Sequence, residues 1–158
     1  TLEAALKDHS PKLVGAALVS LRKIGPENSI ESIRPLLRHP SDSVSISAAH
    51  CCASIQDKDS LPALKELLFG NRSAIRAHAF TAIAAIDCAM GRKLAFELIG
   101  DFNLELRQAV MDFLEENQID LDEGEYELTE ADYRLWSDTE IALRPGQAEF
   151  RQKLRHQR

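Results

Sequence analysis

The chain has 158 residues, of which 44% are apolar and 28% charged, and its formal net charge is −6. This length suits one domain, and the composition is ordinary for a soluble globular protein. Residues 1–118 carry 13 basic and 15 acidic side chains, and this near-neutral body gives no strong electrostatic case for nucleic-acid binding.

The first expected element is a short amphipathic helix over Thr1–Lys7. A longer helix follows, and its apolar residues are Leu13, Ala17, Leu21 and Ile24. Their offsets of four, eight and eleven residues all return to the same side of an α-helix, so this helix presents one apolar face. A turn over residues 25–29 separates it from the next element.

The pattern of the longer helix recurs every 31 residues. The positions in register with Leu13 are Val44, Ile75 and Leu106; with Ala17, they are Ala48, Ala79 and Val110; with Leu21, they are Cys52, Ile83 and Leu114; with Ile24, they are Ile55 and Ile86. We call these elements the first helices. A fixed period of this length is the signature of a helical repeat protein.

The short helix recurs with the same period. Its matching sets are Leu2, Ile33, Leu64 and Ala95; Ala5, Leu36, Leu67 and Leu98; and Leu6, Leu37, Leu68 and Ile99. We call these elements the second helices. Ser29 and Ser60 are expected to cap two of them, and Pro35 and Pro62 are tolerated only near a helix start or at a bend.

The clearest copy of the pattern runs from Ala74 to Asp87, with weaker copies from Lys12, Ser43 and Glu105. It resembles the HEAT-like repeats, over residues 1–118. The resemblance implies an all-α fold, a right-handed α-solenoid of about four helical hairpins that stack to share one core. Because the chain opens within a hairpin, we expect the solenoid to continue N-terminally in a longer protein.

In such solenoids the second helices commonly line the concave face. The candidate partner-binding residues on them are Arg34, Arg38, Lys65, Phe69, Arg92 and Lys93. A basic stripe for DNA or RNA is one interpretation, but Glu31, Glu66 and Glu97 dilute its charge. It also lacks the interleaved aromatic residues that bind single strands, so a protein partner is favoured.

Arg76 and Arg107 lie 31 residues apart, in the same position of two first helices. They form a candidate basic ladder for phosphates. The alternative is that each arginine pairs with an acid of the neighbouring repeat. The alternative is favoured because the same position holds Val14 and Ser45 in the earlier copies.

The triplet His50-Cys51-Cys52 contains residue types that bind metals. Adjacent residues on a helix point about 100° apart and do not converge on one ion, and Cys52 falls on the apolar face. The position of His50 holds Val19, Thr81 and Asp112 in the other copies, and that of His78 holds Ala16, Ser47 and Ala109. We therefore expect no metal, cofactor or catalytic residue in this chain.

The three cysteines form no C-x-x-C pair, and no signal peptide or membrane-length apolar stretch is visible. These features predict a cytoplasmic protein without a disulfide framework or a membrane contact.

Beyond the repeats, residues 119–143 carry nine acidic side chains and one basic, and residues 144–158 carry five basic and one acidic. The acidic segment is expected to be either a linker or a cap, with a short helix opening at Thr129 and carrying Trp136. The basic segment is expected to form a helix with Phe150 and Leu154 on one side.

Residues 138–154 resemble the segment that precedes the catalytic part of bacterial HNH-type restriction endonucleases. The matching residues are Arg144, Gly146, Gln147, Phe150, Arg151 and Leu154, and no His-Asn-His set accompanies them. Two functions follow as hypotheses: a non-catalytic scaffold that binds protein, or the DNA-recognition or regulatory arm of such a nuclease. HEAT-like repeats also occur in bilin lyases and chaperones, a remote third possibility without specific residues here. A small-molecule ligand is not expected.

Overall fold

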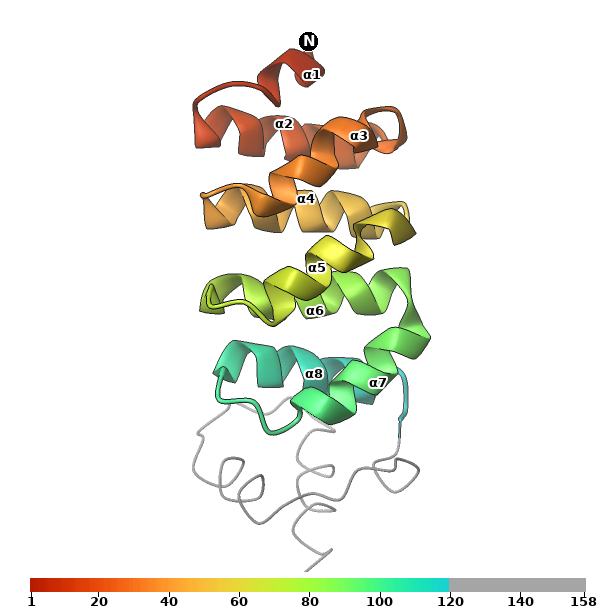
Figure 1. Cartoon of the computed structure of the whole chain (residues 1–158). Helices are drawn as coiled ribbons and strands as arrows, with labels where there is room; N and C mark the ends of the chain where they lie inside the picture. Colours follow the sequence, from red (N-terminus) through yellow and green to blue (C-terminus); the bar gives the residue numbers. More distant parts are fainter. Residues whose placement is uncertain (120–158) are drawn as a thin grey trace, which may run out of the picture.

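The computed structural model describes residues 1–119, which form two layers of helices stacked along one direction (Figure 1). One layer consists of the first helices, α2 (Pro11–Ile24), α4 (Asp42–Ser54), α6 (Ser73–Ile86) and α8 (Leu104–Glu116). They start 31 residues apart, and each packs against the next. The period read from the apolar residues is therefore the spacing of the helices in the stack.

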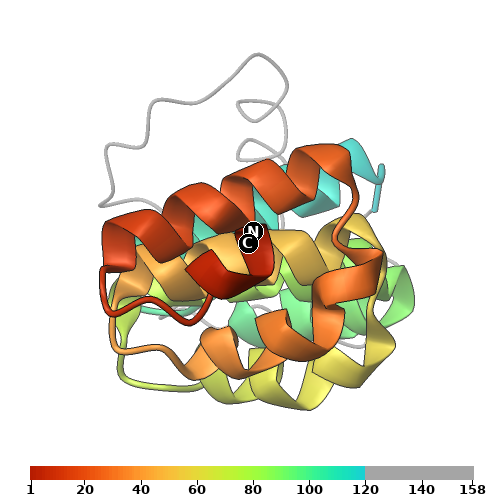
Figure 2. The same cartoon turned by 90° about the horizontal axis from the view of Figure 1, so that it is seen from above.

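The other layer consists of the second helices, α1 (Leu2–Ala5), α3 (Ile30–Ile33) continued by η2 (Arg34–Arg38), α5 (Leu61–Leu68) and α7 (Cys88–Leu98). Single 3-10 turns, η1 (Glu27–Ser29) and η3 (Lys58–Ser60), lead into α3 and α5. Figure 2, which looks along the stack, shows the second helices together on one side of the first helices. Over the described residues the regular elements are all helical, as the sequence predicts.

The two prolines of the second helices lie where their missing N–H groups do least harm. Pro62 is the second residue of α5, and Pro35 is the second residue of η2. The first N–H groups of a helix have no partner within it, so proline is tolerated there. In the repeat that contains Pro35, the second helix changes from α to 3-10 geometry at Arg34, which is the bend that the sequence allowed.

The core runs between the two layers, and two of the predicted core positions are exposed instead. Val44, Ile75 and Leu106 are 0% exposed, but Leu13, in the same register, is 46% exposed. The reason is that α4, α6 and α8 each have a preceding first helix beside them, whereas α2 has none. Ile24, at the end of α2, is 72% exposed, so the apolar pattern overstated the core at this end of the stack.

Ser29 and Ser60 occupy the N-cap positions of α3 and α5, as predicted, but their side chains do not make the capping hydrogen bond. Neither side chain accepts a hydrogen bond from the helix that follows. The hydroxyl of Ser60 donates to the carbonyl of Asp57 at 2.7 Å, and that of Ser29 donates to Glu3 at 3.2 Å. A preceding 3-10 turn already sets the direction of each helix, so both hydroxyls bond elsewhere.

The expected cap or linker around Trp136, the basic helix over 144–158 and the nuclease-like segment over 138–154 lie outside the described residues. Within residues 1–119, no helix is long and apolar enough to cross a membrane.

Candidate functional site

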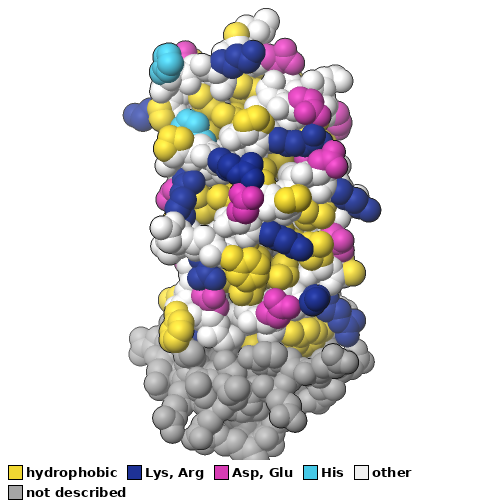
Figure 3. Space-filling view, viewed as in Figure 1, with side chains coloured by type: hydrophobic (Ala, Val, Ile, Leu, Met, Phe, Trp, Pro, Cys, Tyr) yellow, Lys and Arg dark blue, Asp and Glu magenta, His cyan; other side chains and the backbone are white. Residues whose placement is uncertain are grey.

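The second helices present one continuous face, and all six predicted partner-binding residues lie on or next to them. Arg34 and Arg38 belong to η2, Lys65 to α5, and Arg92 and Lys93 to α7, while Phe69 follows α5 directly. Figure 3 views this face and shows Lys and Arg side chains spread along it, with acidic and hydrophobic side chains between them. The face combines charges of both signs with exposed apolar groups.

Arg34 is held by three carboxylates. It donates to Asp57 at 2.7 and 2.9 Å, to Glu31 at 2.8 Å and to Asp59 at 3.0 Å. The hydrogen bonds from Arg34, more than any other effect, lower the pKa of Asp57, although burial of that carboxyl opposes them. Asp57 belongs to the turn of the next repeat, so Arg34 joins two repeats. Its guanidinium is already matched by acids of its own chain.

The neighbouring position along the face combines an ion pair with an exposed aromatic ring. Arg38 donates to Glu66 of the next repeat at 2.7 and 3.0 Å, and both side chains are well exposed. Phe69, one turn after Lys65, is 57% exposed. Within residues 1–119 no ion pair involves Lys65 or Lys93. These lysines and the phenyl ring are available to a partner.

Of the candidate basic ladder, Arg76 is bound within the stack and Arg107 is buried. Arg76 donates to the carbonyl of Leu68, at the end of α5, at 2.7 Å and binds the carboxylate of Asp101 at 2.6 and 2.9 Å. Arg107 is only 2% exposed. Burial alone would raise the pKa of Asp101, but the hydrogen bonds from Arg76 and the charge of Arg107 lower it. For Arg76, this is the expected pairing with an acid of the next repeat.

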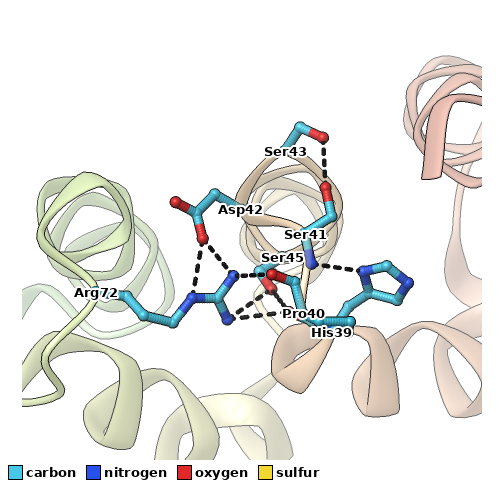
Figure 4. Close-up of polar contacts among 7 residues, drawn as sticks. All are labelled: His39, Pro40, Ser41, Asp42, Ser43, Ser45 and Arg72. Carbon is cyan, nitrogen blue, oxygen red and sulfur yellow. Dashed lines mark hydrogen bonds and ion pairs between the residues drawn. The ribbon is translucent and has the colours of Figure 1, made fainter.

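Arg72 forms the densest polar contact of the described chain (Figure 4). Its guanidinium donates to the carboxylate of Asp42, with Nε at 2.9 Å from Oδ1. It also donates to the carbonyls of His39 at 2.9 Å and Pro40 at 3.2 Å, and to the hydroxyl of Ser45 at 3.4 Å. One side chain therefore joins the end of η2 and the start of α4 to the following repeat.

Arg72 and Arg76 both donate to a carboxylate and to backbone carbonyls of another element. Leu68 is the last residue of α5, and the last carbonyls of a helix lack partners within it and carry partial negative charge, so the guanidinium of Arg76 is favourable there. The sequence had marked Arg72 only as part of a turn. The available signal was its position before a first helix, which also holds Ser10, Ser41 and Asn103. At the equivalent position, the shorter side chain of Asn103 also reaches the preceding repeat, where its amide donates to the carbonyl of Ser73 at 2.8 Å.

The His50-Cys51-Cys52 triplet is part of the packing. Cys51 and Cys52 are 0% exposed, and the Cys51 thiol donates to the carbonyl of Leu18 at 3.3 Å. Burial raises the pKa of Cys51 to about 11 and that of Cys52 to about 12. His50 lies edge-to-face with His78 of α6, with ring centroids 5.4 Å apart. No group of three or more metal-binding side chains occurs in the described part of the chain.

A cavity of about 470 Å³ lies between α6 and α8, and sequence reasoning missed it. Phe80 and Phe113 line it and pack edge-to-face, with centroids 5.6 Å apart. Asp112, Glu116 and Asn117 of the α8 region also line it. A hollow between two helices depends on which side chains are small at a junction, and the apolar period does not report this.

The stack of helical pairs with arginine contacts between repeats defines a helical repeat protein. Comparison with known families agrees: HEAT repeats match residues 1–84. The protein therefore belongs to the HEAT repeat family, which confirms the resemblance over this part of the chain. No curated protein matches the chain. The family match does not reach residues 138–154, and neither comparison supports the resemblance to HNH-type nucleases.

Proposed function

We propose that this HEAT repeat protein is a non-catalytic scaffold that binds another protein through the face of its second helices. The observation that carries the proposal is Phe69, a large apolar side chain that is 57% exposed in the middle of a charged face. Aromatic and arginine side chains supply much of the energy at protein interfaces. Phe69 stands close to two cationic side chains, because Lys65 precedes it by one turn and Arg38 reaches α5 through Glu66.

The chemistry of the face favours a partner that presents an apolar pocket with acidic residues around it. Lys65 and Lys93 extend from α5 and α7 without an ion pair in the described chain. Arg34, in contrast, is matched by its own carboxylates and serves to hold the repeats in position. We therefore assign contact with the partner to Phe69, Lys65 and Lys93, and assign Arg34 a structural role between the repeats.

The proposal also covers the handedness of the stack, the number of repeats and the location of the protein in the cell. We infer a right-handed stack of about four helical hairpins in residues 1–118. We place the protein in the cytoplasm, since its three cysteines are free and two of them are buried. The non-catalytic role rests on the sequence, which carries no recognised catalytic motif.

Photo-crosslinking tests the contact face. Benzoylphenylalanine is introduced at Phe69, and in a matched variant at Phe102, which is 89% exposed in the loop before α8. We expect a specific adduct from position 69 and none of equal yield from position 102. An identified partner is then titrated with Phe69→Ala, for which we expect affinity to fall about tenfold. Equal crosslinking from both positions, or unchanged affinity of Phe69→Ala, would refute the proposed face.

A further inference from the structure

The first helices form a layer whose outer side, away from the second helices, is covered by no other helix of the described chain (Figure 2). In α2 the buried side carries Val14, Leu18 and Leu21. Lys12 and Lys23 are eleven residues apart, about three turns, so both point in one direction, opposite to the buried side. Both lysines are exposed. The outer side of α2 is therefore basic near each of its ends.

The same two positions change from basic to acidic along the stack. The position of Lys12 holds Ser43, Ala74 and Glu105 in the later first helices, and the position of Lys23 holds Ser54, Ala85 and Glu116. All eight side chains are exposed. Both rows thus read lysine, serine, alanine and glutamate from α2 to α8. The outer side of the layer is basic at one end, acidic at the other and uncharged between them.

The middle of the outer side is depleted of charge. Among Lys, Arg, Asp and Glu, α4 contains only Asp42 and α6 contains only Arg76. Both are bound within the chain, Asp42 by Arg72 and Arg76 by Asp101. The solvent-facing side of a helix usually carries charged side chains, whereas the centre of a protein interface is depleted of them. The composition of α4 and α6 is therefore typical of a covered face.

The charges at the two ends are not matched within their own chain. Within residues 1–119, no ion pair involves Lys12, Lys23, Glu105 or Glu116. Asp112, the other outward carboxylate of α8, already accepts a hydrogen bond from Gln108 at 2.9 Å. The two lysines and the two glutamates are thus complementary groups at opposite ends of one face.

We propose that the outer side of the first helices is the contact between two copies of this chain, related by a twofold axis that runs parallel to these helices and passes between α4 and α6. The first helices all run in the same direction (Figure 1), and rotation about this axis keeps that direction but reverses their order. Lys12 of one copy then lies opposite Glu105 of the other, and Lys23 opposite Glu116. The twofold axis repeats both pairs, so four pairs of opposite charge flank the uncharged centre.

The charge pattern selects this arrangement over the other twofold packing of the same face. An axis along the stack would place α2 against α2 and bring Lys12 of one copy to Lys23 of the other, which is unfavourable. The area is also sufficient. The first helices contain 13 or 14 residues. Each is therefore about 20 Å long, and four of them, about 9 Å apart, cover about 700 Å² on each copy. The total of about 1,400 Å² lies within the range of stable interfaces.

This contact lies on the layer opposite to Phe69. Each copy keeps its second helices open, so the dimer presents two Phe69 faces, directed away from each other. The inference goes beyond the proposed function and does not depend on it, because the contact shares no residue with the Phe69 face.

Sedimentation equilibrium of the 158-residue chain measures the association. We expect a reversible dimer, with twice the chain mass of 17.6 kDa, at micromolar concentration. Lys12→Glu with Lys23→Glu places carboxylates opposite carboxylates in all four pairs and is expected to raise the Kd of the dimer at least about a hundredfold. Glu105→Lys with Glu116→Lys places lysines opposite lysines and is expected to have the same effect. These two variants shift the net charge in opposite directions, so net charge alone does not explain a loss in both.

An equimolar mixture of the two reversed variants tests the orientation. In their heterodimer every pair again joins opposite charges, so we expect the mixture to dimerise about as tightly as the unmodified chain. Lys58→Glu, in the turn before α5, is the control and leaves the Kd unchanged. Circular dichroism confirms that each variant is folded.

Three results would overturn the proposal. The first is an unmodified chain that stays monomeric, which would leave this face to a different protein. The second is a dimer that both charge reversals leave intact. The third is a mixture of the reversed variants that stays monomeric.

Discussion

Replacement of Arg72 by alanine is expected to destabilise the protein. The guanidinium donates to the Asp42 carboxylate, to the carbonyls of His39 and Pro40, and to the hydroxyl of Ser45. Its removal leaves the carbonyls of His39 and Pro40 and one carboxylate without this donor. The contact also joins two repeats, so the loss weakens an interface and not only a turn.

The magnitude follows from exposure and the type of each bond. A hydrogen bond from a charged donor contributes about 1.5–3 kcal/mol when buried, whereas an exposed ion pair contributes about 0.2–1 kcal/mol. The Arg72 side chain is 28% exposed and that of Asp42 is 48% exposed, so the contribution of their ion pair to stability is that of an exposed pair. The contact with the His39 carbonyl is better shielded, whereas the contact with the Pro40 carbonyl is exposed, and the sum for Arg72→Ala is about 2–3 kcal/mol.

Urea unfolding followed by circular dichroism measures this loss. Arg72→Lys keeps the charge but cannot span the same acceptors, so we expect it to recover less than half of the stability. Lys65→Ala is the control, because Lys65 is exposed without an ion pair in the described chain and should change stability by less than about 0.5 kcal/mol. If Arg72→Ala unfolds at the same urea concentration as Lys65→Ala, the reasoning about this contact is wrong.

Two further predictions concern packing and protonation. Gly91→Ala should destabilise the protein by about 1–2 kcal/mol because the new Cβ would lie 2.7 Å from the Cβ of Ala84. Gly15→Ala, with nothing within 4 Å of its new Cβ, should stabilise the protein by up to about 1 kcal/mol. Thermal unfolding measures both changes in stability, and a change in the same direction for the two variants would contradict the packing around Gly91. Burial, reinforced by the charge of His78, lowers the pKa of His50 below 6.5. The unfolded chain therefore binds a proton at His50 more readily than the folded chain does, and the free energy of unfolding should fall as the pH drops below about 6.5. His50→Gln should flatten this decline in urea titrations between pH 7 and 5, and an unchanged slope would exclude His50 as its source.

The helical stack could be predicted from the sequence because the same apolar contact recurs in each repeat and requires an apolar residue every 31 positions. Val44, Ile75 and Leu106 occupy one position and are equally buried. Leu13 carries the same signal and is exposed, since burial also requires a preceding helix. A periodic pattern reports the position of a residue in its repeat. It does not report the position of that repeat in the stack.

The polar contacts and the cavity could not be predicted, because they arise where the copies differ. Arg72 binds Asp42 from a position that holds serine or asparagine in the other repeats. The cavity forms where Thr81 and Ala109 replace the two histidines of the earlier junction. Such contacts depend on pairs of residues about 30 positions apart, and each pair occurs once. A single sequence gives no repetition from which to recognise them.

The arginine contacts between repeats also bear on how such a chain can change length in evolution. Arg72 lies 30 residues after Asp42, and Asn103 lies 30 residues after Ser73, so both contacts connect a repeat only with the one before it. Duplication of a 31-residue block in register would copy both halves of such a contact and present them to each other again. An insertion of any other length between such a donor and its acceptor would change the spacing of that pair. The spacing therefore favours growth or shortening by whole repeats and selects against smaller changes within the stack.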